Sequence, residues 1–306
     1  MYFGSVRFFK HLIYASLVIV LLLAILSLKL LLNTKGVGTY TPYEQDNSES
    51  VNESVNESVN ESVDQKSDST PELQKVRLET AQIEYQSLYL ELNNEMPVTE
   101  NSQGKTAYLT FDDGPSARTL EILDILKERN IKATFFVVTS NRDLEILKRI
   151  ADEGHTIGIH SHTHKYSQIY RSTEAFLDDF STCFKKIYEI TSVKPQIFRF
   201  PGGSINAYNR GIYQDIISEM LRRGYLYYDW NISTQDTVNN ITPKKILNNV
   251  KEMVRNQDSI IVLGHDSENK VHTVKALPGI IDFLEDKGYS FDKLDNNVPP
   301  IVFAYQ

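Results

Sequence analysis

From Lys105 to the end of the chain, short apolar runs alternate with helical patterns, and this alternation limits the fold more than any other feature. Strands that alternate with helices form parallel sheets, in which each helix crosses from one strand to the next. We therefore predict an α/β fold with a barrel-like, incompletely closed sheet of seven strand–helix units. The expected strands are Tyr108–Phe111, Thr134–Val138, Thr156–His160, Gln196–Phe200, Tyr225–Trp230, Ser259–Leu263 and Tyr289–Phe291. The expected helices are Thr119–Arg129, Leu144–Glu153, Thr173–Ile190, Ile212–Arg223, Pro243–Val254 and Val274–Lys287.

Polar and charged residues end or follow five of these apolar runs, namely Asp112, His160, Arg199, Asp229 and His265. A β/α barrel builds its active site at the carboxyl ends of its strands. The sequence therefore predicts that these five residues surround one site.

Four of the seven histidines fall within ten residues, at His155, His160, His162 and His164. His160 and His164 are four residues apart, so helical or turn geometry can place both on one side. This spacing is typical of metal-binding pairs, although surface or core histidines are the alternative for an isolated pair. His155 precedes its strand and His162 is expected to point away from its neighbours, so we interpret both as structural.

An adjacent pair of acids, Asp112 and Asp113, follows the apolar run that begins at Tyr108. Two neighbouring buried carboxylates are costly without a cation or other partners. A turn is the alternative, but it explains Gly114 and Pro115 better than it explains two acids. Together with two imidazoles, the pair offers one carboxylate to a divalent metal and a second as a base, which suits metal-assisted hydrolysis.

Three further features fit a hydrolytic site. Arg199 can orient a carboxylate with its fork of donors, although an ordinary surface ion pair is the alternative. Gly202 and Gly203 allow the backbone to approach a ligand, so that a free N–H there can face an oxyanion. His265 follows an apolar run and is either a general acid or a third metal ligand.

Residues 1–35 contain an uncharged, almost wholly apolar run from Leu12 to Leu28, and apolar residues continue to Leu32. About 20 apolar residues span a bilayer, so we expect a membrane anchor. No clear cleavage site of a secretory leader follows, which favours an uncleaved anchor; a buried core helix is the alternative. Basic residues flank both sides of the run, so its orientation is argued from the acidic tract that follows, which resembles a stalk into a cell envelope.

Residues 36–70 include Ser-Val-Asn-Glu repeats, and this polar, acidic tract is expected to be a disordered linker. Residues 71–103 are expected to form an amphipathic helix and a connector. The helix is expected to pack on the following domain, residues 104–306, and brief self-pairing is the alternative. Its apolar positions are spaced at alternating steps of three and four: Leu78, Ala81, Tyr85, Leu88 and Leu92.

Charge is unevenly distributed along the chain. The whole chain carries a net charge of −8. Residues 1–35 hold four basic residues and no acidic ones, and residues 36–103 hold fourteen acidic and three basic residues, which leaves residues 104–306 close to neutral. A neutral domain lacks the basic field that attracts nucleic acid, so no nucleic-acid partner is expected and a neutral glycan fits better. The single cysteine, Cys183, excludes an intrachain disulfide.

Five motifs occur in a fixed order and carry a resemblance to a known family. They are Thr-Phe-Asp112-Asp113-Gly-Pro, His160-Ser-x-x-His164, Arg199-x-Pro201-x-Gly203, Asp229-Trp230 with Asp236, and Leu263-x-His265. Over about residues 104–295, the chain resembles the polysaccharide deacetylases of the NodB-homology type, carbohydrate esterase family 4. The resemblance implies a distorted (β/α)7-type barrel and removal of N-acetyl groups from glycans.

The resemblance also implies roles for individual residues. Asp113, His160 and His164 would hold one divalent metal, with zinc expected and cobalt or another divalent ion as alternatives. Asp112 would be the general base that takes a proton from the attacking water, and Arg199 would position Asp112.

On the leaving-group side, His265 would be the general acid and Asp236 would orient it. The Gly202 N–H would stabilise the oxyanion, while Trp230 and Leu263 would wall the pocket of the acetyl methyl group. Two departures affect substrate preference. Many relatives carry an aromatic residue at the position of Gly202, and many carry a tryptophan directly after the equivalent of Asp236.

We therefore expect a metal-dependent hydrolase that removes N-acetyl groups from an envelope glycan, with peptidoglycan N-acetylglucosamine as the expected substrate. It would be a single-pass protein of the cell membrane with residues 104–306 outside the cell. The alternatives are a deacetylase of an exopolysaccharide, a chitin-like oligomer or an O-acetylated glycan, or a wall-glycan-binding protein without activity. The sequence leaves the oligomeric state open.

Overall fold

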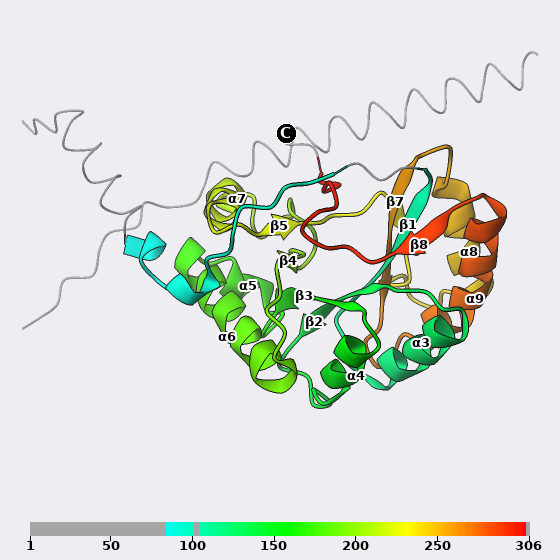
Figure 1. Cartoon of the computed structure of the whole chain (residues 1–306), viewed down its shortest axis with the longest axis horizontal. Helices are drawn as coiled ribbons and strands as arrows, with labels where there is room; N and C mark the ends of the chain where they lie inside the picture. The colour runs from blue at the N-terminus through cyan, green and yellow to red at the C-terminus, as the bar shows by residue number, and fades with distance from the viewer. Residues whose placement is uncertain (1–83, 101–103, 304–306) are drawn as a thin grey trace, which may run out of the picture. The chain divides into compact units, whose positions relative to one another are not determined.

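A computed structural model describes residues 84–100 and 104–303, and their strands form one parallel sheet (Figure 1). Along the sheet the order is β5-β4-β3-β2-β1-β7-β6, with β8 beside β1, and every pairing is parallel. The α/β class is therefore confirmed. The strands are β1 (Thr106–Asp112), β2 (Thr134–Val138), β3 (Thr156–Ser161), β4 (Ile197–Phe198), β5 (Leu226–Tyr227), β6 (Ile232–Ser233), β7 (Ser259–His265) and β8 (Ser290–Asp292).

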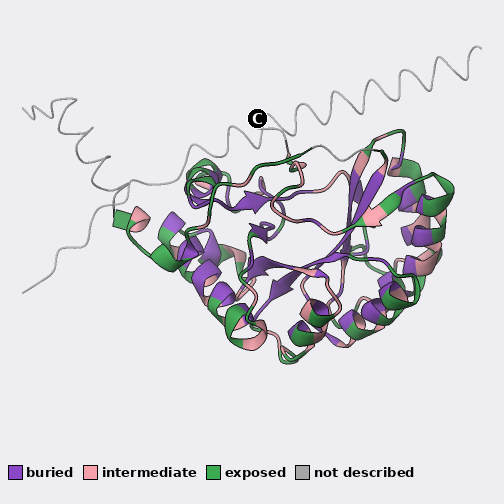
Figure 2. Ribbon diagram, viewed as in Figure 1, coloured by how far each residue is buried: buried purple, intermediate pink, exposed green. Residues whose placement is uncertain are grey.

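Helices follow most strands and lie in an arc along the outer side of the sheet, where Figure 1 shows α6, α4, α3, α9 and α8 in turn. Their buried faces contact the sheet and their exposed faces point outward, as the colours of Figure 2 show. The helices are α3 (Ala117–Glu128), α4 (Ile146–Asp152), α5 (Tyr166–Ile169), α6 (Thr173–Thr191), α7 (Tyr213–Arg222), α8 (Pro243–Met253) and α9 (Val271–Asp286), preceded by the short 3-10 helix η1 (Leu90–Leu92).

Local sequence explains where several helices begin. The Ser116 side chain caps α3 in a reciprocal capping box with Thr119. The side chains of Ser172 and Thr242 cap α6 and α8 by accepting one backbone N–H each, and Pro243 occupies the first turn of α8. The central strand β1 is buried along its whole length, as expected of a strand that helices cover on one side and other chain segments on the other.

The apolar run Tyr225–Trp230 does not form one strand. It contributes β5, which pairs with β4, and the chain then continues into β6, which pairs with β7 at the other end of the sheet. The Asn231 side chain makes this change possible, because its amide accepts a hydrogen bond from the Ile261 N–H (2.8 Å) and donates one to the Ser259 carbonyl (3.1 Å). The result is a parallel half-barrel whose two end strands are joined by the chain itself rather than by a hydrogen-bonded ladder.

The helix expected to continue through Tyr85 and Leu88 to Leu92 ends earlier. Residues 84–86 are helical, but Tyr89 has a φ of 51°, in the left-handed region, and η1 follows. The reason is a tertiary contact. The Arg223 guanidinium donates hydrogen bonds to the carbonyl oxygens of Tyr85, Leu88 and Tyr89 (2.8–3.1 Å). A continuing helix would use those oxygens for its own backbone bonds.

The expected anchor in residues 1–35, the linker in residues 36–70 and the first part of the amphipathic helix lie outside the described residues. Within the described ranges, none of the helices has the length and hydropathy needed to span a membrane.

Candidate active site

The carboxyl ends of the strands surround a cavity of about 390 Å³ that collects nearly all of the residues expected from the sequence. This placement follows from the parallel sheet, because all strands point their carboxyl ends to one edge. The residues expected from the sequence that line the cavity are Asp112, Asp113, His160, His164, Gly202, Trp230, Asp236, Leu263 and His265. Arg199 does not line the cavity, because its side chain is fully buried behind the Asp112 carboxylate to which it donates.

Asp113, His160 and His164 form a group of possible metal ligands at one side of the cavity. One ligand atom from each residue lies within 4.8 Å of the others. The Asp113 Oδ1 atom is 3.6 Å from His160 Nε2 and 3.3 Å from His164 Nε2. A catalytic zinc site commonly has two imidazoles and one carboxylate and leaves a further position open.

The protonation state of His160 suits a ligand. Its Nδ1 atom lies 2.9 Å from the Arg199 carbonyl oxygen, which must accept a proton from that nitrogen, so the Nε2 lone pair faces Asp113 and the cavity. Burial, opposed by Asp113, lowers the pKa of His160 to about 3. The ring is therefore neutral at physiological pH, and the donor set fits a divalent ion.

Asp112 is held by a buried arginine. The guanidinium of Arg199 donates to Asp112 Oδ1 (2.9 Å), to Thr110 Oγ1 (2.7 Å) and to the backbone oxygens of Tyr228 and Asp229. Arg199 is fully buried and its donors are shared among these partners, so the alternative of a surface ion pair is wrong. Asp112 Oδ2 is 4.0 Å from His160 Nε2, which places the second carboxylate beside the ligand group.

Asp236 and His265 form a hydrogen-bonded pair that also lines the cavity. Asp236 Oδ1 lies 2.7 Å from His265 Nδ1, and its Oδ2 accepts the backbone N–H of His265 (2.9 Å) and the hydroxyl of Thr273 (2.6 Å). Burial lowers the pKa of His265, but the bond and charge of Asp236, with smaller contributions from Asp112 and Asp113, outweigh it and raise this pKa to about 9. The ring is therefore protonated at neutral pH, with Nε2–H available to the cavity.

Gly202, Trp230 and Leu263 complete the wall. Gly202 has a φ of 78°, and its N–H makes no hydrogen bond within the described residues. The Trp230 ring packs edge-to-face on Phe303, with 4.9 Å between centroids. Leu263 is almost fully buried, so these two side chains offer an apolar surface.

His155, His162 and Asp229 also lie outside this cavity, so the expectation that Asp229 surrounds the site is wrong. His155 accepts the Ala133 N–H at Nδ1 (3.1 Å), and burial lowers its pKa to about 4. The Nδ1 atom of His162 is 3.0 Å from Thr139 Oγ1. Asp229 accepts bonds from the Ser204 N–H and hydroxyl and from the Phe303 N–H, and thereby ties two loops together.

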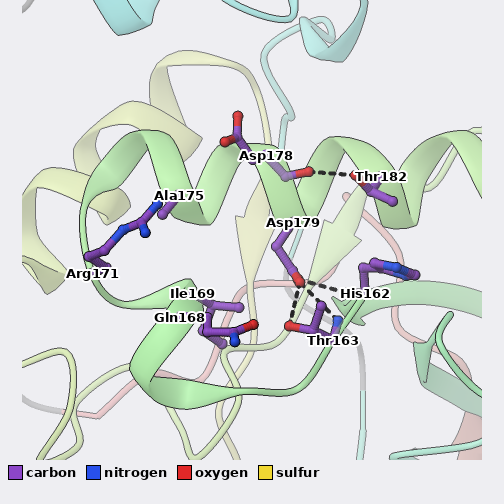
Figure 3. Close-up of a pocket in the computed structure, with 9 residues that line it drawn as sticks. All are labelled: His162, Thr163, Gln168, Ile169, Arg171, Ala175, Asp178, Asp179 and Thr182. Carbon is purple, nitrogen blue, oxygen red and sulfur yellow. Dashed lines mark hydrogen bonds between the residues drawn. The ribbon is translucent and has the colours of Figure 1, made fainter.

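Asp179 on α6 is a positioning residue that the sequence did not reveal. Its carboxylate accepts four hydrogen bonds from the loop between His160 and His164, at 2.6–2.8 Å, and Figure 3 shows it pointing to His162 and Thr163. The Ser161 hydroxyl that donates to Asp179 also accepts the His164 N–H (2.8 Å). His164 has a φ of 56°, so its unusual backbone conformation is supported by this network.

Four other lining residues were also missed: Tyr166, Ser233, Gln235 and Thr237. No local pattern distinguishes them, because each reaches the cavity through a loop or a short element whose path depends on the rest of the fold.

The fold and the site define a hydrolase of the β/α type, and the comparisons with known proteins identify its family. Residues 99–220 match the family model described as polysaccharide deacetylase. YheN of Bacillus subtilis, which is assigned to the polysaccharide deacetylases, is 32% identical over 250 residues that cover 77% of this chain and 86% of YheN. The chain belongs to the polysaccharide deacetylases, and the expected resemblance to the NodB-homology type is confirmed.

Two further similarities concern proteins with named substrates. A peptidoglycan-N-acetylglucosamine deacetylase of Bacillus cereus is 32% identical over 211 residues, 66% of this chain and 74% of that protein. The crystal structure of the catalytic domain of a peptidoglycan N-acetylglucosamine deacetylase from Eubacterium rectale is similar with a TM-score of 0.65 and 37% identity. That similarity covers 69% of this chain and 97% of the solved domain. The chain is therefore an enzyme of the hydrolytic polysaccharide deacetylase class.

Proposed function

We propose that this protein is a metal-dependent deacetylase that removes the N-acetyl group of N-acetylglucosamine in peptidoglycan. One observation carries the proposal: a carboxylate held by Arg199 and a protonated imidazole held by Asp236 line the same cavity as a group of three metal ligands. A general base, a general acid and a Lewis-acid site are the parts that hydrolysis of an unreactive amide requires.

Asp113, His160 and His164 would hold the metal, and we propose zinc because two imidazoles and a carboxylate suit it. When bound, zinc lowers the pKa of water from 15.7 to about 7 and polarises a carbonyl oxygen. Asp112 then takes the proton of the attacking water. Arg199 keeps the Asp112 carboxylate in one orientation, since it donates to Oδ1 and leaves Oδ2 facing the ligand group.

His265 is the proposed acid for the leaving amine. An amide nitrogen must gain a proton before it departs, and His265 carries that proton at neutral pH because Asp236 raises its pKa to about 9. Asp236 also fixes the ring, because its two oxygens bind Nδ1 and the backbone N–H of the same residue. The proton on Nε2 is therefore the one that is delivered.

Gly202 and the apolar wall account for the acetyl group. The unpaired Gly202 N–H is the proposed donor to the oxyanion, and Trp230 with Leu263 would surround the methyl group. These two bulky apolar side chains would favour a methyl group over a polar substituent at this part of the wall.

The substrate and the location are further parts of the proposal. The named substrates of two similar proteins support peptidoglycan N-acetylglucosamine. The apolar run in residues 1–35 and the acidic linker in residues 36–70 support a single-pass anchor that holds residues 104–306 outside the cell membrane, close to the wall.

Acetate release by the zinc-loaded full chain in detergent tests the proposal. The substrates are purified peptidoglycan, N-acetylglucosamine oligomers and O-acetylated xylan. We expect release from peptidoglycan and a loss of about 10²–10⁴-fold in the Asp112→Asn variant, the usual contribution of a general base. Asp152→Asn, at an exposed position of α4, is the matched control and should retain full activity.

Two results would contradict parts of the proposal separately. Release from xylan alone would overturn the substrate assignment and leave the chemistry intact. Absence of release from every substrate, by a folded and zinc-loaded protein, would favour a wall-glycan-binding protein instead.

A further inference from the structure

Two tyrosines from different elements meet at the rim of the cavity. Tyr166, in α5, lines the cavity and packs edge-to-face on Tyr208, with 5.2 Å between ring centroids. Tyr166 also packs edge-to-face on the proposed ligand His164 (5.2 Å). Tyr208 is 60% exposed, although it lies in the loop that follows the cavity residue Gly202. The pair therefore extends an aromatic surface from the metal group out into solvent.

Gly202 makes room for this arrangement. A Cβ atom at Gly202 would lie 3.1 Å from both Cε2 and Oη of Tyr166, tighter than an ordinary contact. The Tyr166 ring therefore occupies space that a side chain at position 202 would take, directly beside the proposed oxyanion donor. This places an aromatic ring against the reacting centre from α5 rather than from the Gly202 loop.

The position of Tyr208 is built rather than incidental. The Asn206 side chain accepts the Tyr208 N–H (2.8 Å) and donates to the carbonyl oxygens of Pro201 and Gly203 (both 3.1 Å). Asn209 accepts the Asn206 N–H (2.8 Å) and is itself fully buried. The backbone that carries Tyr208 is thus tied to the Gly202 segment, so the exposed ring is presented in one place. A pre-organised aromatic ring binds a ligand with little loss of conformational entropy.

We propose that Tyr166 and Tyr208 form a sugar-binding subsite, in which the exposed ring of Tyr208 stacks on the sugar next to the one whose acetamide enters the cavity. A pyranose ring presents a face of C–H groups that matches an aromatic ring, and the Tyr208 hydroxyl can bond to sugar oxygens at its edge. The proposed occupant is a neighbouring sugar because Tyr166 belongs to both surfaces, so a glycan chain with one sugar at the cavity can continue along this pair. The inference rests on the proposed function, since it assumes that a glycan chain is the ligand.

The test compares N-acetylglucosamine oligomers of two to six sugars with the zinc-loaded full chain. In the wild-type protein, kcat/KM for acetate release should rise with oligomer length. Tyr208→Ala should remove about tenfold of that rise, an ordinary value for one aromatic stacking contact, through KM and with little change in kcat. Tyr208→Trp should retain the rise because it restores the ring. Tyr188→Ala is the matched control, because Tyr188 is 45% exposed on α6 and does not line the cavity.

Each other outcome has a definite meaning. Equal kcat/KM values for wild type and Tyr208→Ala at every length would overturn the subsite, as would an equal loss in Tyr188→Ala. A loss that is the same for two sugars and for six would also overturn it, because it would not depend on a neighbouring sugar. If the wild-type protein releases no acetate, the proposed function fails, and the subsite is then decided by calorimetric binding of the six-sugar oligomer. Weaker binding by Tyr208→Ala than by Tyr188→Ala would support it, and equal binding would overturn it.

Discussion

Replacement of Asp179 by asparagine should loosen the loop that carries His164 without unfolding the domain. The Asp179 carboxylate accepts two backbone N–H groups, those of His162 and Thr163, as well as two hydroxyl groups. An asparagine amide has one acceptor oxygen and one NH₂ group. Whichever way it is oriented, its NH₂ group opposes one backbone N–H, while the hydroxyl on that side can rotate to accept.

The size of the effect follows from this single orphaned donor. A hydrogen bond to a charged acceptor is worth about 1.5–3 kcal/mol, and the half-buried position of Asp179 favours a value of about 2 kcal/mol. Because His164 must be in place to bind the metal, the loosened loop lowers zinc affinity by at most about 30-fold, the factor that 2 kcal/mol represents. Saturating zinc should restore kcat, because Asp179 positions a ligand and does not contact the reacting atoms.

Competition with a chromogenic chelator measures the zinc affinity of the full chain, and thermal unfolding of the metal-free protein checks that it is folded. Asp178→Asn is the control, because Asp178 is the exposed neighbour on the same helix and its carboxylate points away from the loop (Figure 3). A zinc affinity of Asp179→Asn within twofold of the wild type would refute the reasoning. An equal loss in Asp178→Asn would refute it as well.

Three further predictions concern pH and stability. Asp236→Asn removes the group that raises the pKa of His265 to about 9. The alkaline limb of the profile of kcat against pH should therefore move from about pH 9 toward pH 6.5 or below. An unchanged limb would exclude His265 as the general acid. The pKa of His155 is about 4 when folded and 6.5 when unfolded, so its contribution to stability is complete above pH 6.5 and is lost as pH falls through 4. The loss is about 3 kcal/mol, and urea unfolding of His155→Gln should show correspondingly weaker pH dependence over that window. Arg223→Met leaves the carbonyl oxygens of residues 85–89 without this donor and should lower the free energy of urea unfolding by about 3 kcal/mol. Proteolysis within residues 84–100 should also become faster. Proteolysis at the wild-type rate would show that this contact does not hold the segment.

Much of the site was predictable because its residues lie at the ends of local, strongly patterned elements. The expected strands Thr134–Val138 and Thr156–His160 agree with β2 and β3 to within one residue, and most of the expected site residues line the cavity, with Arg199 and Asp229 as exceptions. Parallel strands bring their carboxyl ends to one edge, so order along the chain was sufficient to predict proximity. The side chain of Arg199 differs, because it is completely buried and donates hydrogen bonds to β1 and to the segment after β5, which a sequence pattern does not specify.

Long-range packing decided the features that have no local signal. The apolar run Tyr225–Trp230 forms only the short strand β5, because Asn231 directs the chain to β7 at the other end of the sheet. The helix toward Leu92 was ended by Arg223, more than 130 residues later in the chain. Asp179 and Tyr166 reach the site from helices whose orientation depends on the sheet beneath them. Periodicity and motif spacing report contacts between neighbours in sequence, and so they located the strands, the helices and the chemical residues. The hydrogen bonds that hold the His164 loop and the aromatic surface beside Gly202 join distant segments, and only the folded chain brings those together.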